Sequence, residues 1–376
     1  MIQEPLYILT VLLTLIFMSE WLTKNTILKK ISGPLLAIIL GAIFANLGLI
    51  PSASNASPLY DGIFHYIAPL SIFYLLLGVQ LKELKKAGLP MLVAFSIGSL
   101  GTVLGVLAGL SLIDEVEVFG ENASAIAGMM TGTYTGGSAN FNAVALHYNI
   151  LKEGAVYTGI VVADNIVTAV WMLVTLALPA IMLKMRPHAK AMVQGNKDVE
   201  AFDEHEKMTL HSFGAMLCIG VGSLFISFEL AALTQLPFVL ILTTIALLLA
   251  QFPLVQKVPG AKLFGIFSVY LFLVVVGAFC ELTALIEVGR HAFDIMLFTV
   301  TIVLIHGLFL VAAGLLLKSD WQVIAIASQA NIGGASTAMA LAQSFKRNDL
   351  LLPAILAGSL GSALGTYLGF LMAGLL

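Results

Sequence analysis

The chain has 376 residues, of which 59% are hydrophobic and only 10% are charged. Soluble domains carry roughly a quarter charged residues, so this composition excludes a water-soluble protein and predicts an all-α polytopic membrane protein in contact with the lipid bilayer. The formal net charge of −3 provides no basic field, which excludes nucleic acid as a partner.

Apolar stretches of about 20 residues are long enough to cross a bilayer as helices. Twelve such segments cover residues 6–22, 33–50, 63–81, 89–112, 122–148, 154–183, 209–228, 236–252, 263–282, 293–317, 321–344 and 350–376. A long polar interruption at residues 184–208 divides them six and six, and it is too short and too mixed in charge to fold alone. We therefore predict a first half at residues 1–183, a linker at 184–208 and a second half at 209–376.

Orientation follows from lysine and arginine, because cytoplasmic loops hold an excess of both. Two lysine clusters, at residues 24–30 and 82–86, are expected inside, and the acidic loop at residues 113–121 is expected outside. The N-terminus then lies outside a membrane that we expect to be the bacterial cytoplasmic membrane. If every segment crossed, the basic linker would also lie outside, so one segment of the first half is predicted not to cross.

The segment at residues 122–148 is the best candidate, because its centre, residues 131–140, is rich in glycine and hydroxyl side chains. Its counterpart in the second half is the segment at residues 321–344, centred on residues 328–337. We expect each to be a re-entrant hairpin or a broken helix. The two halves then start from opposite sides of the membrane, which predicts two inverted-topology repeats, each with about five spanning helices and one Gly-Gly segment.

The Gly-Gly pairs are the first candidate site, because backbone that departs from helix at membrane depth is tolerated only where protein or a water-filled cavity satisfies it. The alternative is that small residues let two helices approach closely. Two matched pairs, each flanked by serine, threonine and asparagine, favour a binding site at the exposed helix termini. The predicted substrate contacts are Thr133, Thr135, Gly136, Gly137, Ser138, Asn140 and Asn142, with Gln329, Asn331, Gly333, Gly334, Ser336 and Thr337.

The second candidate is Asp164, followed by Asn165, near the middle of the apolar segment at residues 154–183. A carboxylate at that depth costs about 2.5 to 3.5 kcal/mol on insertion scales and usually faces a cavity or a partner. A neutral Asp164 that hydrogen-bonds between helices is the alternative. The matching place in the second half, residues 357–360, holds no acid, so a single carboxylate predicts coupling to one proton or one sodium ion.

The paired Gly-Gly segments, the carboxylate on the following helix and the inverted halves resemble the superfamily of cation:proton antiporters and organic-anion symporters. Within it, residues 131–142 and 327–337 are most similar to an uncharacterised family of bacterial and plastid integral membrane proteins. Citrate-type and glutamate:sodium symporters carry Gly-Gly-x-Gly, and the resemblance implies substrate and sodium binding at the hairpin tips. Here the last glycine is missing, since Ser138-Ala139 and Ala335-Ser336 follow the pairs.

The antiporter branch carries Asp-Asp or Asn-Asp on the helix after the first break, which implies that the acid binds protons and sodium in turn. This chain carries a related pair in the opposite order, Asp164-Asn165. The resemblance further implies a transport part that moves against a scaffold part, often within a homodimer.

Two transport functions remain open. The first is a sodium- or proton-coupled symporter of a small organic anion or amino-acid-like solute, and the second is a monovalent cation:proton antiporter. An intramembrane hydrolase would need a second acid, a serine with a lysine or histidine base, or a zinc motif. The sequence shows none at recognisable spacing, so we expect no enzyme activity and no cofactor beyond Na⁺ or H⁺ as the coupling ion.

Overall fold

A computed structural model describes residues 3–26, 33–79, 81–185, 208–234, 236–281, 286 and 288–376. Within these residues the chain is helical and contains no β-strand. Residues 186–207, which make up nearly all of the predicted linker, lie outside the described part.

The helices of the first half follow the predicted segments closely. They are α1 (Pro5–Asn25), α2 (Gly33–Asn46), α3 (Pro58–Gly62), α4 (Ala68–Leu76), α5 (Leu89–Ser111), α6 (Glu115–Phe119), α7 (Ala123–Gly136), α8 (Ser138–His147) and α9 (Gly154–Met185). A π-helical turn, Ile63–Ile67, joins α3 to α4 into one continuous run. The segment predicted at residues 122–148 is thus two helices that are interrupted at Gly137.

The second half has the same order of long, short and interrupted helices. They are α10 (Leu210–Thr234), α11 (Phe238–Leu249), α12 (Pro253–Gln256), α13 (Ala261–Ala278), α15 (Ala292–Leu317), α16 (Trp321–Ile332), α17 (Gly334–Ser344) and α18 (Leu351–Leu375). This order agrees with the repeat hypothesis, while the inverted relation of the halves stays a prediction.

The described residues contain 8 helical runs that are long and apolar enough to cross a membrane, and two shorter apolar helices, α2 and α11. These correspond to the crossings expected from the sequence, for example Leu89–Ser111 for the segment at residues 89–112. The prediction of a polytopic all-α membrane protein is confirmed.

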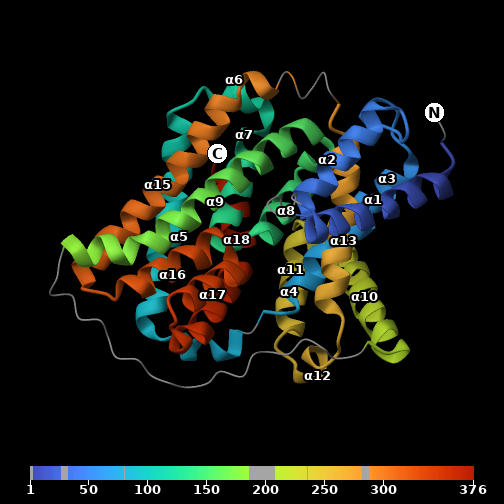
Figure 1. The fold of residues 1–376 in the computed structure, drawn as a ribbon. Helices are drawn as coiled ribbons and strands as arrows, with labels where there is room; N and C mark the ends of the chain where they lie inside the picture. The colour runs from blue at the N-terminus through green and yellow to red at the C-terminus, as the bar shows by residue number, and fades with distance from the viewer. Residues whose placement is uncertain are drawn as a thin grey trace.

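Two groups of helices stand side by side in Figure 1, with α1–α4 and α10–α13 on the right and α5, α7, α9 and α15–α18 on the left. Glycines set the closest contacts inside each group. A Cβ added to Gly41 of α2 would overlap the backbone of α13 at Val274, and one added to Gly105 of α5 would overlap α15 at Ile302. Small residues allow such close helix approach in membranes, where van der Waals packing replaces the hydrophobic driving force.

The interrupted helix α7 is held by α18 through opposed glycines. Gly128 and Gly132 of α7 face Gly369 and Gly365 of α18, and a Cβ added to either α18 glycine would meet a carbonyl oxygen of its partner at 2.7 Å. One turn further, a Cβ on Gly136 would overlap the backbone of α18. The three α7 glycines are spaced four residues apart, so they form one face that fixes α7 against α18.

The helices α7 and α8 fold back on each other as an antiparallel hairpin, called here hairpin 1. A Cβ added to Gly132 would lie 3.2 Å from Cβ of Asn140, and one added to Gly128 would lie 3.2 Å from Cγ1 of Val144. Hairpin 2 is formed by α16 and α17, where the Thr337 hydroxyl donates to the Gln329 carbonyl at 3.2 Å. The glycine pairs therefore form the tips of two helical hairpins.

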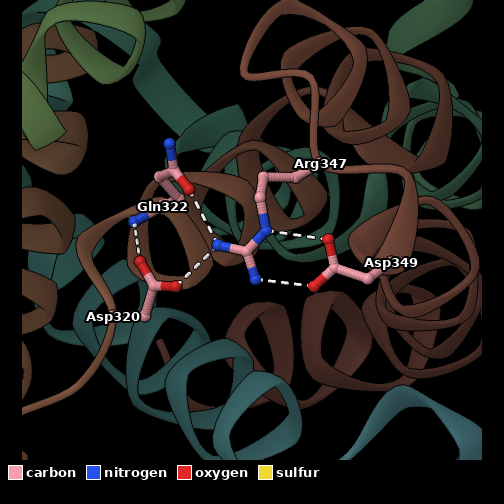
Figure 2. Close-up of polar contacts among 4 residues, drawn as sticks. All are labelled: Asp320, Gln322, Arg347 and Asp349. Atoms are coloured by element: carbon pink, nitrogen blue, oxygen red, sulfur yellow. Dashed lines mark hydrogen bonds and ion pairs between the residues drawn. The ribbon is translucent and has the colours of Figure 1, made fainter. Parts of the chain in front are cut away.

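A charged clamp closes the base of hairpin 2, where α16 begins and α17 ends. Figure 2 shows Arg347 between two carboxylates, with 2.8 Å from Nη1 to Oδ2 of Asp320 and 2.6 Å from Nη2 to Oδ2 of Asp349. The Arg347 Nη1 also donates to Oε1 of Gln322 at 2.8 Å. The clamp ties the two ends of the hairpin together.

Breaking this clamp is expected to destabilise the protein measurably. The Arg347 side chain is only 11% exposed, so Arg347→Met leaves two poorly solvated carboxylates without a partner and should cost about 1 to 3 kcal/mol of unfolding free energy. Lys152→Met is the matched control, because the Lys152–Asp61 pair is 48% and 67% exposed and such pairs contribute little. Thermal unfolding of both variants checks this, and equal melting temperatures would contradict it.

Candidate functional site

The tips of the two hairpins meet inside the protein. A Cβ added to Gly137 would lie 4.0 Å from Cα of Gly334, and one added to Gly334 would lie 3.8 Å from the carbonyl oxygen of Gly136. Gly137 has φ +95° and Gly334 has φ +78°, a left-handed conformation that glycine adopts without the steric cost of a side chain. The two Gly-Gly pairs are therefore neighbours in space.

Helix α9 presents a polar face to both hairpins. Tyr157, Asp164, Thr168, Trp171 and Thr175 follow one another at intervals of seven, four, three and four residues, which places them on one side of a helix. We call these five residues the α9 polar face. The opposite side carries apolar residues that are open to the membrane, including Leu173, which is 67% exposed.

The half-buried Asp164 lies near the tip of hairpin 1. Its Oδ1 accepts a hydrogen bond from the Thr168 hydroxyl at 3.3 Å. The fully buried Tyr134, two residues before the tip, interacts electrostatically with the same carboxylate, although its hydroxyl makes no hydrogen bond of good geometry. One carboxylate and two hydroxyl oxygens thus gather at the tip, and such hard oxygen donors suit a proton or a small cation.

The lower turns of α9 hold hairpin 1 in place. The Tyr157 hydroxyl, two turns before Asp164, donates to Oδ1 of Asn142 in α8 at 2.6 Å. Both residues are buried, so this bond fixes α8 to the helix that carries the acid.

The later turns of α9 contact hairpin 2. Nε1 of Trp171 donates to Oγ of Ser328 at 2.9 Å, and Nε2 of Gln329 donates to Oγ1 of Thr175 at 2.8 Å. Ser328 also lies 2.9 Å from Nε2 of His306, whose Nδ1 lies 2.9 Å from the Gly98 carbonyl. Both ring nitrogens of this buried histidine therefore have partners, and they tie α16 to α5, α9 and α15.

Six buried side-chain atoms have no hydrogen-bond partner among the residues that the structure describes, and four of them lie on the helices α7 and α16 that lead into the tips. These four are the hydroxyl oxygens of Thr131, Tyr134 and Thr135 on α7 and the side-chain carbonyl Oε1 of Gln329 on α16. Each of these side chains is fully buried. An unsatisfied buried polar atom costs about 1 to 3 kcal/mol, so each of these atoms on the two helices that lead into the tips is a position that a ligand, an ion or water would satisfy.

The structure divides the predicted substrate contacts into different roles. Thr133, Thr135, Gly136, Gly137, Gly333 and Gly334 lie within one turn of the tips, and Ser138 and Ser336 are exposed one or two residues beyond them. Thr337 bonds back to the backbone of hairpin 2, and Asn142 is bound by Tyr157. Asn165, predicted to couple the ion with Asp164, donates to the Val161 carbonyl within α9 at 2.7 Å.

Two of the predicted contacts fasten the hairpins to their neighbours. Asn140 donates to the Gly361 carbonyl at 3.4 Å and accepts from Thr366 at 2.8 Å, which joins hairpin 1 to α18. Asn331 accepts from Ser99 at 2.7 Å and donates to the Phe95 carbonyl at 3.1 Å, which joins hairpin 2 to α5. Their amide groups are occupied by protein partners.

Sequence reasoning missed Tyr134 and the α9 polar face. Tyr134 lies inside the glycine-rich stretch at residues 131–140, where no local pattern distinguishes it as a contact. The face could have been found, because Thr168, Trp171 and Thr175 continue the helical spacing from Asp164. Only the fold shows that side chains of this face contact both hairpins.

Two comparisons bear on the chain as a whole. It is 28% identical over 365 residues to the "Uncharacterized membrane protein YjcL" of Bacillus subtilis (strain 168), an alignment that covers 92% of this chain and 89% of that protein. A family model described as "Protein of unknown function (DUF819)" matches residues 7–376. Because the match spans nearly every residue, including both hairpins and the α9 polar face, the chain belongs to the DUF819 family of proteins.

Proposed function

We propose that this protein is a secondary active transporter that couples the movement of one sodium ion or proton to a small organic anion or amino-acid-like solute. The observation that carries the proposal is the position of Asp164. It lies on the α9 polar face beside the tip of hairpin 1, and this tip contacts the tip of hairpin 2. The acid supplies the ion site, and the tips supply the solute site.

Ion coupling follows from the cost of moving a charge through a low-dielectric barrier. An ionised Asp164 is expensive there unless a cation neutralises it. A loaded site with a bound ion is nearly neutral and can move between the two sides, whereas the empty ionised site is held back. Thr168 and Tyr134 add oxygens beside the carboxylate, as a sodium ion or a proton-bearing carboxyl requires.

A monovalent cation:proton antiporter is the second candidate. One specific feature favours it: the unpartnered side-chain atoms on α7 and α16 are all oxygens. Oxygen atoms can coordinate a cation without any organic solute. The superfamily resemblance includes both transport modes. In either mode we propose no enzymatic reaction and no cofactor apart from the ion.

The purified full-length protein in proteoliposomes tests the proposal. Uptake of a mixed pool of labelled amino acids and carboxylates is measured under an imposed inward sodium gradient, an inward proton gradient or neither, and an internal pH dye follows proton movement. Symport predicts that one gradient drives accumulation of a solute. Cation:proton exchange without any solute would establish the antiporter, and the absence of both activities would contradict transport.

A further inference from the structure

We propose that the transported solute is a zwitterion, with its ammonium group at Oε1 of Gln329 and its carboxylate at the adjoining N-termini of α8 and α17. This inference rests on the proposed function. Of the two solute classes named there, it selects the amino-acid-like solute over the organic anion. It follows from which polar groups near the tips are already satisfied and which are open.

The open amide oxygen of Gln329 requires a donor. Its Nε2 is committed to Thr175 at 2.8 Å, so the side chain is held and Oε1 points away from that partner. This oxygen is buried and accepts no hydrogen bond from the part of the chain that the structure describes. A carboxylate carries no hydrogen to donate at neutral pH, whereas an ammonium group carries three and gains a charge-assisted bond.

The neighbouring amides offer little to an anion. Nδ2 of Asn140 is bonded to the Gly361 carbonyl, and Nδ2 of Asn331 is bonded to the Phe95 and Ala327 carbonyls. Helices α5, α7, α8 and α15–α18 contain no lysine or arginine, and neither do residues 154–183 of α9. An anionic solute would therefore find no side-chain cation in these helices.

The hairpin tips nevertheless provide one place for a carboxylate. Helix α8 has 10 residues and begins after Gly137, and helix α17 has 11 residues and begins after Gly333. Neither helix has a side-chain cap. The Asn140 N–H donates to the Gly137 carbonyl at 3.1 Å, while the N–H groups of the residues before it in α8 and of the first turn of α17 stay available, and each terminus carries about half a positive charge. The close approach of Gly137 and Gly334 brings the two termini together around one small anionic group.

The charge balance points the same way. When Asp164 holds its cation, the site has no net charge from side chains, so a neutral zwitterion leaves the loaded site neutral. A carboxylate solute would add a negative charge that only the helix termini offset, and a buried charge without full compensation is costly. Gln329 precedes Gly333 by four residues, about one helical turn, so its side chain belongs to the turn that leads into the tip of hairpin 2.

Thermal unfolding of the purified full-length protein in lipid nanodiscs tests this inference without requiring transport. The probes are the common L-amino acids, the matched 2-hydroxy acids, which lack the ammonium group, and the matched amines, which lack the carboxylate. We expect at least one amino acid to raise the melting temperature. Its hydroxy acid and its amine should each bind about 10- to 100-fold more weakly, because each loses a charge-assisted contact.

Two variants locate the ammonium group. Gln329→Met removes the open oxygen and should weaken the amino acid about tenfold or more, with little effect on its hydroxy acid. Gln343→Met makes the same replacement at an exposed position of α17 and should change neither. Stabilisation by hydroxy acids equal to that by amino acids, an equal loss of both in Gln329→Met, or no binding by any amino acid would overturn the inference. These outcomes differ from a failure of the proposed function. In that case an amino acid would still bind, but it would not accumulate in proteoliposomes under a sodium or a proton gradient.

Discussion

Asp164→Asn is expected to yield a folded protein that cannot accumulate solute against a gradient. Asparagine keeps the volume and can still accept from Thr168, but it cannot be neutralised by binding a cation, so the ion gradient no longer biases the movement of the site. The expected loss of gradient-driven accumulation is complete. Solute exchange, in which labelled solute outside trades with unlabelled solute inside, should survive where solute binding does not require the ion.

Uptake and exchange in proteoliposomes, measured side by side, check this prediction. Asp294→Asn is the matched control, because it makes the same replacement in the first turn of α15, away from the hairpin tips, and should behave as wild type. Accumulation that is unchanged in Asp164→Asn would remove the coupling role from this residue. Loss of folded protein would instead favour the interpretation that Asp164 is a structural hydrogen-bond partner.

Gly137→Leu and Gly334→Leu are expected to abolish transport while the protein still inserts and folds. At both positions an added Cβ meets atoms only at 3.8 to 4.0 Å, so the first carbon fits, but the rest of a leucine side chain would press against the opposite tip. The positive φ of each glycine adds a strain of about 1 to 3 kcal/mol to a substituted residue, which a folded protein of this size should tolerate.

Gly136→Leu provides the contrast, because a Cβ there would overlap the backbone of α18 and should prevent folding. Size-exclusion chromatography separates folded from aggregated protein, and exchange measurements report transport. Full activity in both tip variants would exclude the tips as the solute site. Aggregation of all three variants would mean that the glycines serve packing alone.

Much of the fold was predictable because the bilayer constrains length and composition strongly. The runs of apolar residues gave the helix boundaries to within a few positions, and the glycine-rich centres gave the two interruptions. The sequence could not show that α7 and α8 lie antiparallel, since that depends on Gly128 and Gly132 contacting residues on the returning helix.

The site was predictable only in outline. Glycine and Asp164 stand out because each is unusual at membrane depth, but an asparagine looks the same whether it binds a solute or a neighbouring helix. Asn140 and Asn331 fasten the hairpins to α18 and α5, which requires tertiary contacts more than two hundred residues apart. The unpartnered state of Gln329 Oε1 likewise depends on which side chains pack around it in the fold, and no local sequence pattern indicates that.

Reverse coupling is the most direct test of ion-coupled solute transport at Asp164. Proteoliposomes are loaded with a transported solute and diluted into medium without it, and the outward movement of radioactive sodium or of protons is followed with no ion gradient imposed. Symport predicts that the solute gradient drives the ion outward in wild type and that Asp164→Asn abolishes this ion movement. Solute efflux with no accompanying ion movement in wild type, or the same ion movement in Asp164→Asn, would contradict the coupling of solute to ion through this carboxylate.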